Sequence, residues 1–144
     1  MPDPIEQFQA QLTALRASTV PAQTWTLAQA IAHCAQSVEC SLAGYPRLRS
    51  GLFRATIGPL VKRKFIRADR MSHDVTAAIA GATAIPATVT LADACDRASA
   101  ALAAFTAFDG ELAPHLAYGR CTKAEYAQLH WLHFADHLRS FGLA

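Results

Sequence analysis

The sequence predicts an all-α fold, and its composition is the first reason. Alanine, which has the highest helix propensity, is the most frequent residue in the 144-residue chain. Runs of alternating valine, isoleucine and threonine, which are typical of strands, are missing. Helix-start signals also occur in order along the chain, and they predict four main helices and one interrupted helical segment.

Capping residues mark the first two helices. In the stretch "DPIE", Asp3 is placed to cap a helix that runs to about Arg16, with a proline at its first position. In "TLAQ", Thr26 caps the second helix and Gln29 completes a capping box. This helix is predicted to end at Gly44, because glycine readily adopts the conformation that terminates helices.

The middle of the chain is less regular. The stretch "SGLFRATIGPLVKRKFIR" has a helical pattern that Gly58 and Pro59 interrupt, so we predict two short helices or one sharp kink there. Residues 67–89 contain glycine and proline without periodicity and are predicted to form a long loop. A connection of this length predicts a four-helix bundle with at least one crossover.

The last two helices begin at further capping signals. Thr90 starts one helix, while Thr122 and Glu125 form the capping box of the other, which Gly142 ends. A chain of this length is typical of one domain, so we predict a single helical domain over residues 1–144.

Charge and hydropathy narrow the classes of partner. The net charge is only +2 and aromatic residues are sparse among the basic ones, so we expect no nucleic-acid partner. No apolar stretch approaches the roughly 18 residues that span a bilayer. The first residues also lack the basic start and following apolar run of a secretory signal. We therefore expect a cytoplasmic protein without a membrane partner. Its cysteines lack zinc-ribbon spacing and are expected to be reduced core thiols; they are Cys34, Cys40, Cys95 and Cys121.

The last predicted helix carries half of the six histidines, in "YAQLHWLHFADHLRSFG". At about 100° per residue, four side chains share an arc of roughly 60° that faces the core, whereas Arg139 lies well away from it. The arc consists of Tyr126, His130, His133 and His137. His133 and His137 have the i, i+4 spacing by which two helical imidazoles reach one metal ion. Buried histidines also serve as hydrogen-bonded packing residues, so this helix alone leaves both roles open.

A third ligand would have to come from another helix, and His33 is the candidate. His33 lies beside the apolar stripe of the second predicted helix, and the small residues Ala30 and Ser37 share its side. An ion could therefore approach it. Periodicity equally allows an exposed position on the flank of the helix, so spacing does not decide between the two.

Four segments resemble an uncharacterised family within the DinB/YfiT-like superfamily: "WTLAQAIAHCAQSVECSLAGYP", "LFRATIGPLVKRKFI", "APHLAYG" and "HFADHLRSFG". The resemblance covers most of the chain, from about Trp25 to Gly142. It implies a four-helix bundle, commonly dimeric, with a histidine on the second helix and an HxxxH pair on the last that together bind one divalent ion. That pattern falls here on His33, His133 and His137. His130, one turn earlier, is an alternative ligand or a pocket residue.

The resemblance also implies a class of chemistry. Characterised relatives in the superfamily include metal-dependent thiol transferases and a maleylpyruvate isomerase, so we expect a transferase or hydrolase that acts on a small thiol. Three neutral imidazoles would leave the ion its full charge and an open position for a thiolate or water. Zinc, nickel and iron all suit such ligands. The sequence keeps Arg139 after the last histidine but departs from the superfamily pattern at Ser140. The alternative is a non-catalytic bundle that retains the fold as a binding or structural protein.

A basic segment and several polar side chains are candidates for contact with the substrate. Eight of the 13 lysines and arginines lie within residues 47–70. They are predicted to form either a solvated helix face or a basic entrance to the site that attracts an anionic thiol. His115, in the "APHLAYG" turn, is a candidate pocket residue together with Ser37, Tyr126 and Arg139. His73, in "MSHD", is expected to be a solvent-exposed loop residue.

Trp131 lies on the flank of its helix opposite the histidine arc. Together with the abundant alanine and leucine, it predicts apolar surface left over for a homodimer.

Overall fold

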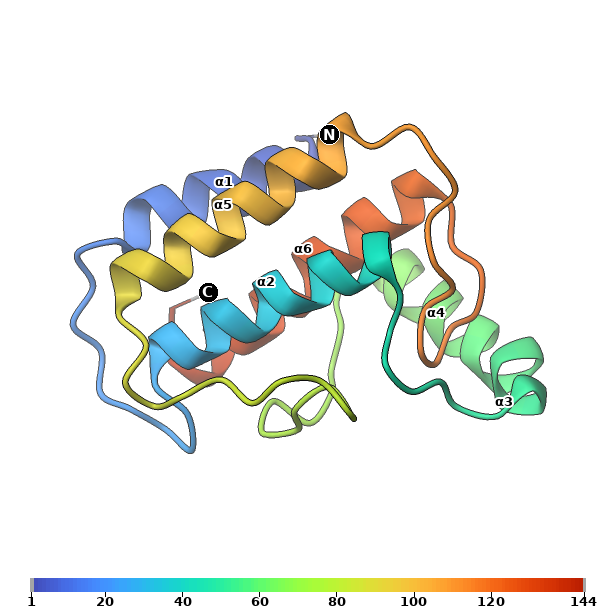
Figure 1. Cartoon of the computed structure of the whole chain (residues 1–144), viewed down its shortest axis with the longest axis horizontal. Helices are drawn as coiled ribbons and strands as arrows, with labels where there is room; N and C mark the ends of the chain where they lie inside the picture. The colour runs from blue at the N-terminus through green and yellow to red at the C-terminus, as the bar shows by residue number, and fades with distance from the viewer. Residues whose placement is uncertain (1, 144) are drawn as a thin grey trace.

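The computed structural model describes residues 2–143, which form α-helices and no strand, and this confirms the all-α prediction (Figure 1). The helices are α1 (Pro4–Leu15), α2 (Leu27–Ala43), α3 (Gly51–Ala55), α4 (Ile57–Ala68), α5 (Leu91–Ala107) and α6 (Lys123–Ser140). None of these helices is long and apolar enough to cross a membrane.

The helices α1, α2, α5 and α6 begin where the capping signals predict. Asp3 and Thr90 accept hydrogen bonds from backbone N–H groups in the first turns of α1 and α5. Thr26 and Thr122 form reciprocal capping boxes with the glutamine and the glutamate three residues later. Gly44 follows α2 with a φ of 107°, a conformation that favours glycine.

The interruption in the middle segment lies two residues earlier than predicted. The helical segment breaks at Thr56, between α3 and α4, and not at Gly58 and Pro59. Pro59 falls in the first turn of α4, where backbone N–H groups have no helical partner and a proline therefore costs no hydrogen bond. Glycine is required at position 58 for close packing, because a Cβ there would lie 1.9 Å from the carbonyl oxygen of Ala117.

The helices α1, α2, α5 and α6 enclose one large apolar core. α2 packs along α5, and α6 contacts both α1 and α2 (Figure 1). The rings of Phe8 and Phe134 stack with centroids 4.1 Å apart between α1 and α6. Ile31 from α2 and Leu102 from α5 are buried in the same cluster. The second and last of the long helices are thus neighbours, which places their histidines on facing surfaces.

Two long connections lie beside the α2–α6 surface. The one between α4 and α5, residues 69–90, has Met71 and Ile79 buried against the helices. The one between α5 and α6, residues 108–122, contains the turn with His115 and approaches α4 closely at Gly58. Cys34, Cys40 and Cys95 are buried and all four cysteines are free thiols, as predicted for a reduced protein.

Candidate metal centre

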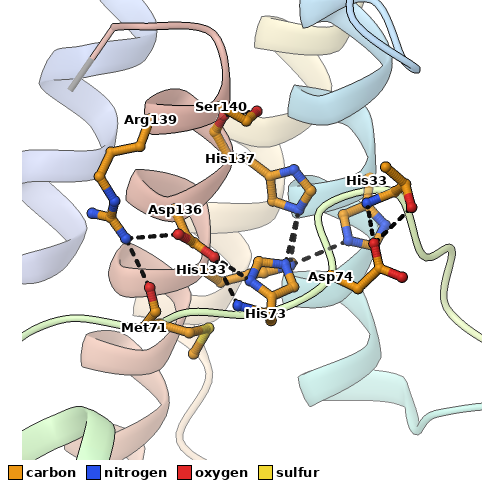
Figure 2. Close-up of polar contacts among 10 residues, drawn as sticks. His33, Met71, His73, Asp74, His133, Asp136, His137, Arg139 and Ser140 are labelled. Atoms are coloured by element: carbon orange, nitrogen blue, oxygen red, sulfur yellow. Dashed lines mark hydrogen bonds and ion pairs between the residues drawn. The ribbon is translucent and has the colours of Figure 1, made fainter.

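α2 and α6 bring three of the predicted histidines together (Figure 2). The Nε2 atom of His33 lies 3.2 Å from Nε2 of His133, which in turn lies 3.2 Å from Nε2 of His137. All three ligand atoms lie within 4.8 Å of one another. His33 and His137 are buried and His133 is half-buried, so the group is largely withdrawn from water.

The separations of these nitrogens fit a shared ion. Two imidazole nitrogens bound to one tetrahedral Zn²⁺ at about 2.0–2.1 Å are themselves about 3.3 Å apart. Two of the three separations, each 3.2 Å, match that value, and the third is at most 4.8 Å. Three buried histidines this close together can therefore bind a divalent metal ion.

Burial keeps the cluster in the neutral form that binds metal. It lowers the pKa of His33 to about 4 and the pKa of His137 to about 2. Burial, followed by the neighbouring histidines, lowers the pKa of His133 well below its ordinary value. Because each imidazole is neutral near pH 7, a ring nitrogen with a lone pair is available without loss of a proton.

A fourth histidine, His73, lies against the cluster, and the prediction that it is a solvent-exposed loop residue is wrong. Its Nε2 atom is 3.3 Å from Nε2 of His137, and its side chain is only 25% exposed. Its Nδ1 atom lies 2.7 Å from Oδ2 of Asp136. Burial lowers the pKa of His73, although the neighbouring Asp136 opposes that shift.

Asp136 and Arg139 hold the loop that carries His73. The backbone N–H of His73 donates to Oδ2 of Asp136 at 3.0 Å, while Arg139 donates to Oδ1 of Asp136 at 2.8 Å. Arg139 also donates to the carbonyl oxygen of Met71 at 2.7 Å (Figure 2). Arg139, expected as a pocket residue, thus fastens the loop to α6. Sequence reasoning missed Asp136, although it lies between the two histidines of the HxxxH pair.

His130 lies outside the three-histidine group. Its Nε2 atom is 3.1 Å from Oγ of Ser41, whose hydroxyl donates to the carbonyl oxygen of Val38 at 2.6 Å. The Ser41 oxygen therefore accepts from His130, which places the proton of His130 on Nε2. Burial lowers the pKa of this histidine to about 3.

A cavity of about 370 Å³ adjoins the cluster. It is lined by the predicted pocket residues Ser37, His115, Tyr126 and His130 together with His33, His73 and His133. Of the basic segment, Arg49 alone is among the residues that line this cavity. Lys62 instead pairs with Glu125, at 3.1 Å, and most of the other basic side chains of the segment are exposed, as expected for a solvated surface.

His115 presents a hydrogen-bond donor in this cavity. Its Nδ1 atom accepts from the backbone N–H groups of Ala117 and Tyr118, at 3.0 and 3.2 Å. Nδ1 therefore has no proton, and the single proton of the neutral ring lies on Nε2. Burial lowers the pKa of His115 to about 3, which keeps the ring neutral.

Comparison with known proteins identifies the family of the chain. A family model described as "Protein of unknown function (DUF1569)" matches residues 4–142. The chain belongs to this family. The DUF1569 match covers all six helices and every histidine of the cluster. No curated protein and no solved structure matches the chain, so the geometry of this DUF1569 protein is the guide to its chemistry.

Proposed function

We propose that this DUF1569 protein is a metal-dependent enzyme whose divalent ion is held by His33, His133 and His137. The convergence of three neutral imidazoles, with ligand atoms within 4.8 Å of one another and two contacts of 3.2 Å, is the observation that carries the proposal. Each of these side chains comes from the interior face of a helix, so the ligands need little ordering when the ion binds.

Hydrogen bonding alone is a poor account of the cluster. Nδ1 of His73 donates to Asp136, so its Nε2 atom can only accept, and the proton in the contact with His137 must belong to His137. The same His137 proton would also have to serve the contact with His133. At most two of the three close contacts can thus be full hydrogen bonds, whereas one cation satisfies all of these lone pairs.

We further propose that the chain is a single DinB-like four-helix-bundle domain. α1, α2, α5 and α6 would form the bundle, with α3 and α4 in the crossover connection between its second and third helices. The proposal is supported by the position of His33 on the second long helix and of an HxxxH pair on the last, the pattern that the superfamily resemblance implies.

The reaction that fits this site is transfer to a small thiol or hydrolysis of a small electrophile. When bound, a divalent ion held by neutral imidazoles supplies positive charge that lowers the pKa of a thiol or water ligand. A cavity of about 370 Å³ accommodates a small molecule. Arg49 and Nε2 of His115 could donate hydrogen bonds to an anionic group of that substrate.

We also propose a homodimer. Four large apolar side chains lie exposed in the segment that includes α3 and the start of α4, where a second copy could cover them. They are Leu48, Leu52, Ile57 and Leu60. Trp131, on which the sequence-based expectation rested, is half-buried against Phe134 and contributes less free surface than expected.

The test is the metal content of the purified protein after dialysis. The wild type should retain about one divalent ion per chain, and His137→Ala should lose it, because two ligands on one side rarely retain an ion. His130→Gln is the matched control, since it changes a buried histidine of the same helix outside the cluster. Equal metal in wild type and His137→Ala, or none in either with zinc, nickel or iron, would favour the non-catalytic alternative.

A further inference from the structure

We propose that His73 supplies a fourth nitrogen to the same ion, and that Asp136 is the positioning residue that aims it. This inference rests on the proposed function, because it concerns the ion that His33, His133 and His137 hold. It assigns a role to the loop between α4 and α5, which contributes no ligand to the three-histidine site.

His73 lies at a distance from the cluster that is compatible with a shared ion. Nε2 of His73 lies 3.3 Å from Nε2 of His137, compared with 3.2 Å for each of the two contacts within the three-histidine group. The ring centroid of His73 lies 4.7 Å from that of His133 and 4.9 Å from that of His137. The three rings of the group are 4.8–5.0 Å apart. His73 thus lies about as close to His133 and His137 as those two histidines lie to each other.

The ring of His73 is also oriented as a metal ligand would be. A histidine that binds a metal ion almost always donates its other ring N–H to a carboxylate, a carbonyl or water, which fixes the tautomer and the ring. His73 does this through Nδ1 and Asp136, so the lone pair lies on Nε2, the atom that approaches the cluster. Among the described residues, His73 is the one member of the four whose second ring nitrogen bonds to a protein side chain.

Contacts within the protein alone fasten the loop that carries His73. Asp136 accepts from both the ring and the backbone of His73, and Arg139 bonds to Asp136 and to the Met71 carbonyl (Figure 2). The Met71 side chain is buried against Leu129 and other residues of α6. These contacts hold His73 in place, so that little conformational entropy is lost if it binds the ion.

A fourth ligand would change what the site can do. Four nitrogens fill the positions of a tetrahedral ion, whereas a five- or six-coordinate ion keeps a position for substrate. The His73 loop would therefore favour an ion of higher coordination number, or would have to yield its nitrogen to the substrate. Neither consequence follows from three histidines alone.

The primary test counts coordinated imidazoles in the full chain loaded with Cu²⁺, by pulsed electron paramagnetic resonance. Four equivalent imidazole couplings are expected for the wild type and three for His73→Ala. Three couplings in the wild type would overturn the role of His73 and leave the three-histidine site intact. A wild type that binds neither Cu²⁺, Zn²⁺ nor Ni²⁺ would instead overturn the proposed function.

Affinity for Zn²⁺, measured by competition with a chromophoric chelator, gives a second readout. Asp136→Asn should weaken binding about 10- to 100-fold, since loss of a partner that orients a ligand has that effect. His73→Ala should weaken it at least tenfold, and added imidazole should restore the Cu²⁺ spectrum. Thr76→Ala, an exposed change in the same loop, is the control and should bind as wild type does. Unchanged affinity in both Asp136→Asn and His73→Ala would contradict the proposal.

Discussion

Mild acid should destabilise the metal-free protein strongly, because its interior holds neutral histidines. Burial lowers the pKa of four histidines to between about 2 and about 4; they are His33, His115, His130 and His137. In the unfolded chain the same groups have a pKa of about 6.5. Since the folded pKa values are the lower ones, the unfolded chain binds more protons, and the free energy of unfolding falls as the pH drops below about 6.5.

The size of the effect follows from the shifts. At about pH 5.5, one unit below the unfolded pKa, each histidine that stays neutral in the folded protein costs about 1.4 kcal/mol of stability. Four such groups together cost about 5–6 kcal/mol, against a typical total stability of about 5–15 kcal/mol. Most carboxylates titrate below this range, so the window from about pH 7.5 to about pH 5.5 isolates the histidines.

Urea unfolding followed by circular dichroism, with a chelator present, measures this loss at the two pH values. His130→Gln keeps a side-chain N–H for the Ser41 oxygen, and His115→Asn keeps an acceptor for two backbone N–H groups. Each variant should reduce the pH-dependent loss by about 1.4 kcal/mol. A wild-type loss below about 1.4 kcal/mol, the share of a single histidine, would refute the assignment of buried neutral rings.

Two further predictions concern packing and assembly. Gly58→Ala should cost about 3 kcal/mol, because its Cβ would lie 1.9 Å from the Ala117 carbonyl oxygen, whereas at Gly51 the nearest atom to an added Cβ is 4.0 Å away. Equal thermal midpoints for Gly58→Ala and Gly51→Ala would contradict this reasoning. In sedimentation at micromolar concentration the wild type should have twice the chain mass of 15.4 kDa, and Leu60→Glu should give the monomer. A monomeric wild type would remove the homodimer.

The helix starts could be predicted from sequence because capping is a local interaction. Thr26 and Thr122 each bond to a backbone group three residues away, so a short stretch of sequence contains all the information needed. The break at Thr56 could not be located in the same way. The break lies two residues before Gly58, which packs against Ala117 in a contact between segments about 60 residues apart that no short stretch of sequence reveals.

The candidate site was predictable to different degrees for different ligands. The i, i+4 spacing predicts that His133 and His137 point the same way, since helix geometry alone fixes it. For His33, periodicity left an exposed flank position open, and only the packing of α2 on α6 brings it into the cluster. His73 lies in a loop without periodicity, so no pattern in its neighbourhood indicates where its ring points.

The residues that position His73 lie on α6. Asp136 lies between the two histidines of the HxxxH pair, and Arg139 lies one turn further along. Arg139 was predicted to be a pocket residue and Asp136 had no predicted role; neither shares the arc of the histidines. In the structure they form a second face of the same helix, which binds the loop and turns His73 toward the cluster. A charged pair at these positions on a ligand-bearing helix therefore indicates a bound loop as readily as a solvated surface. Reversing the charge of either Asp136 or Arg139 alone should release the loop, while the three helical histidines keep their positions.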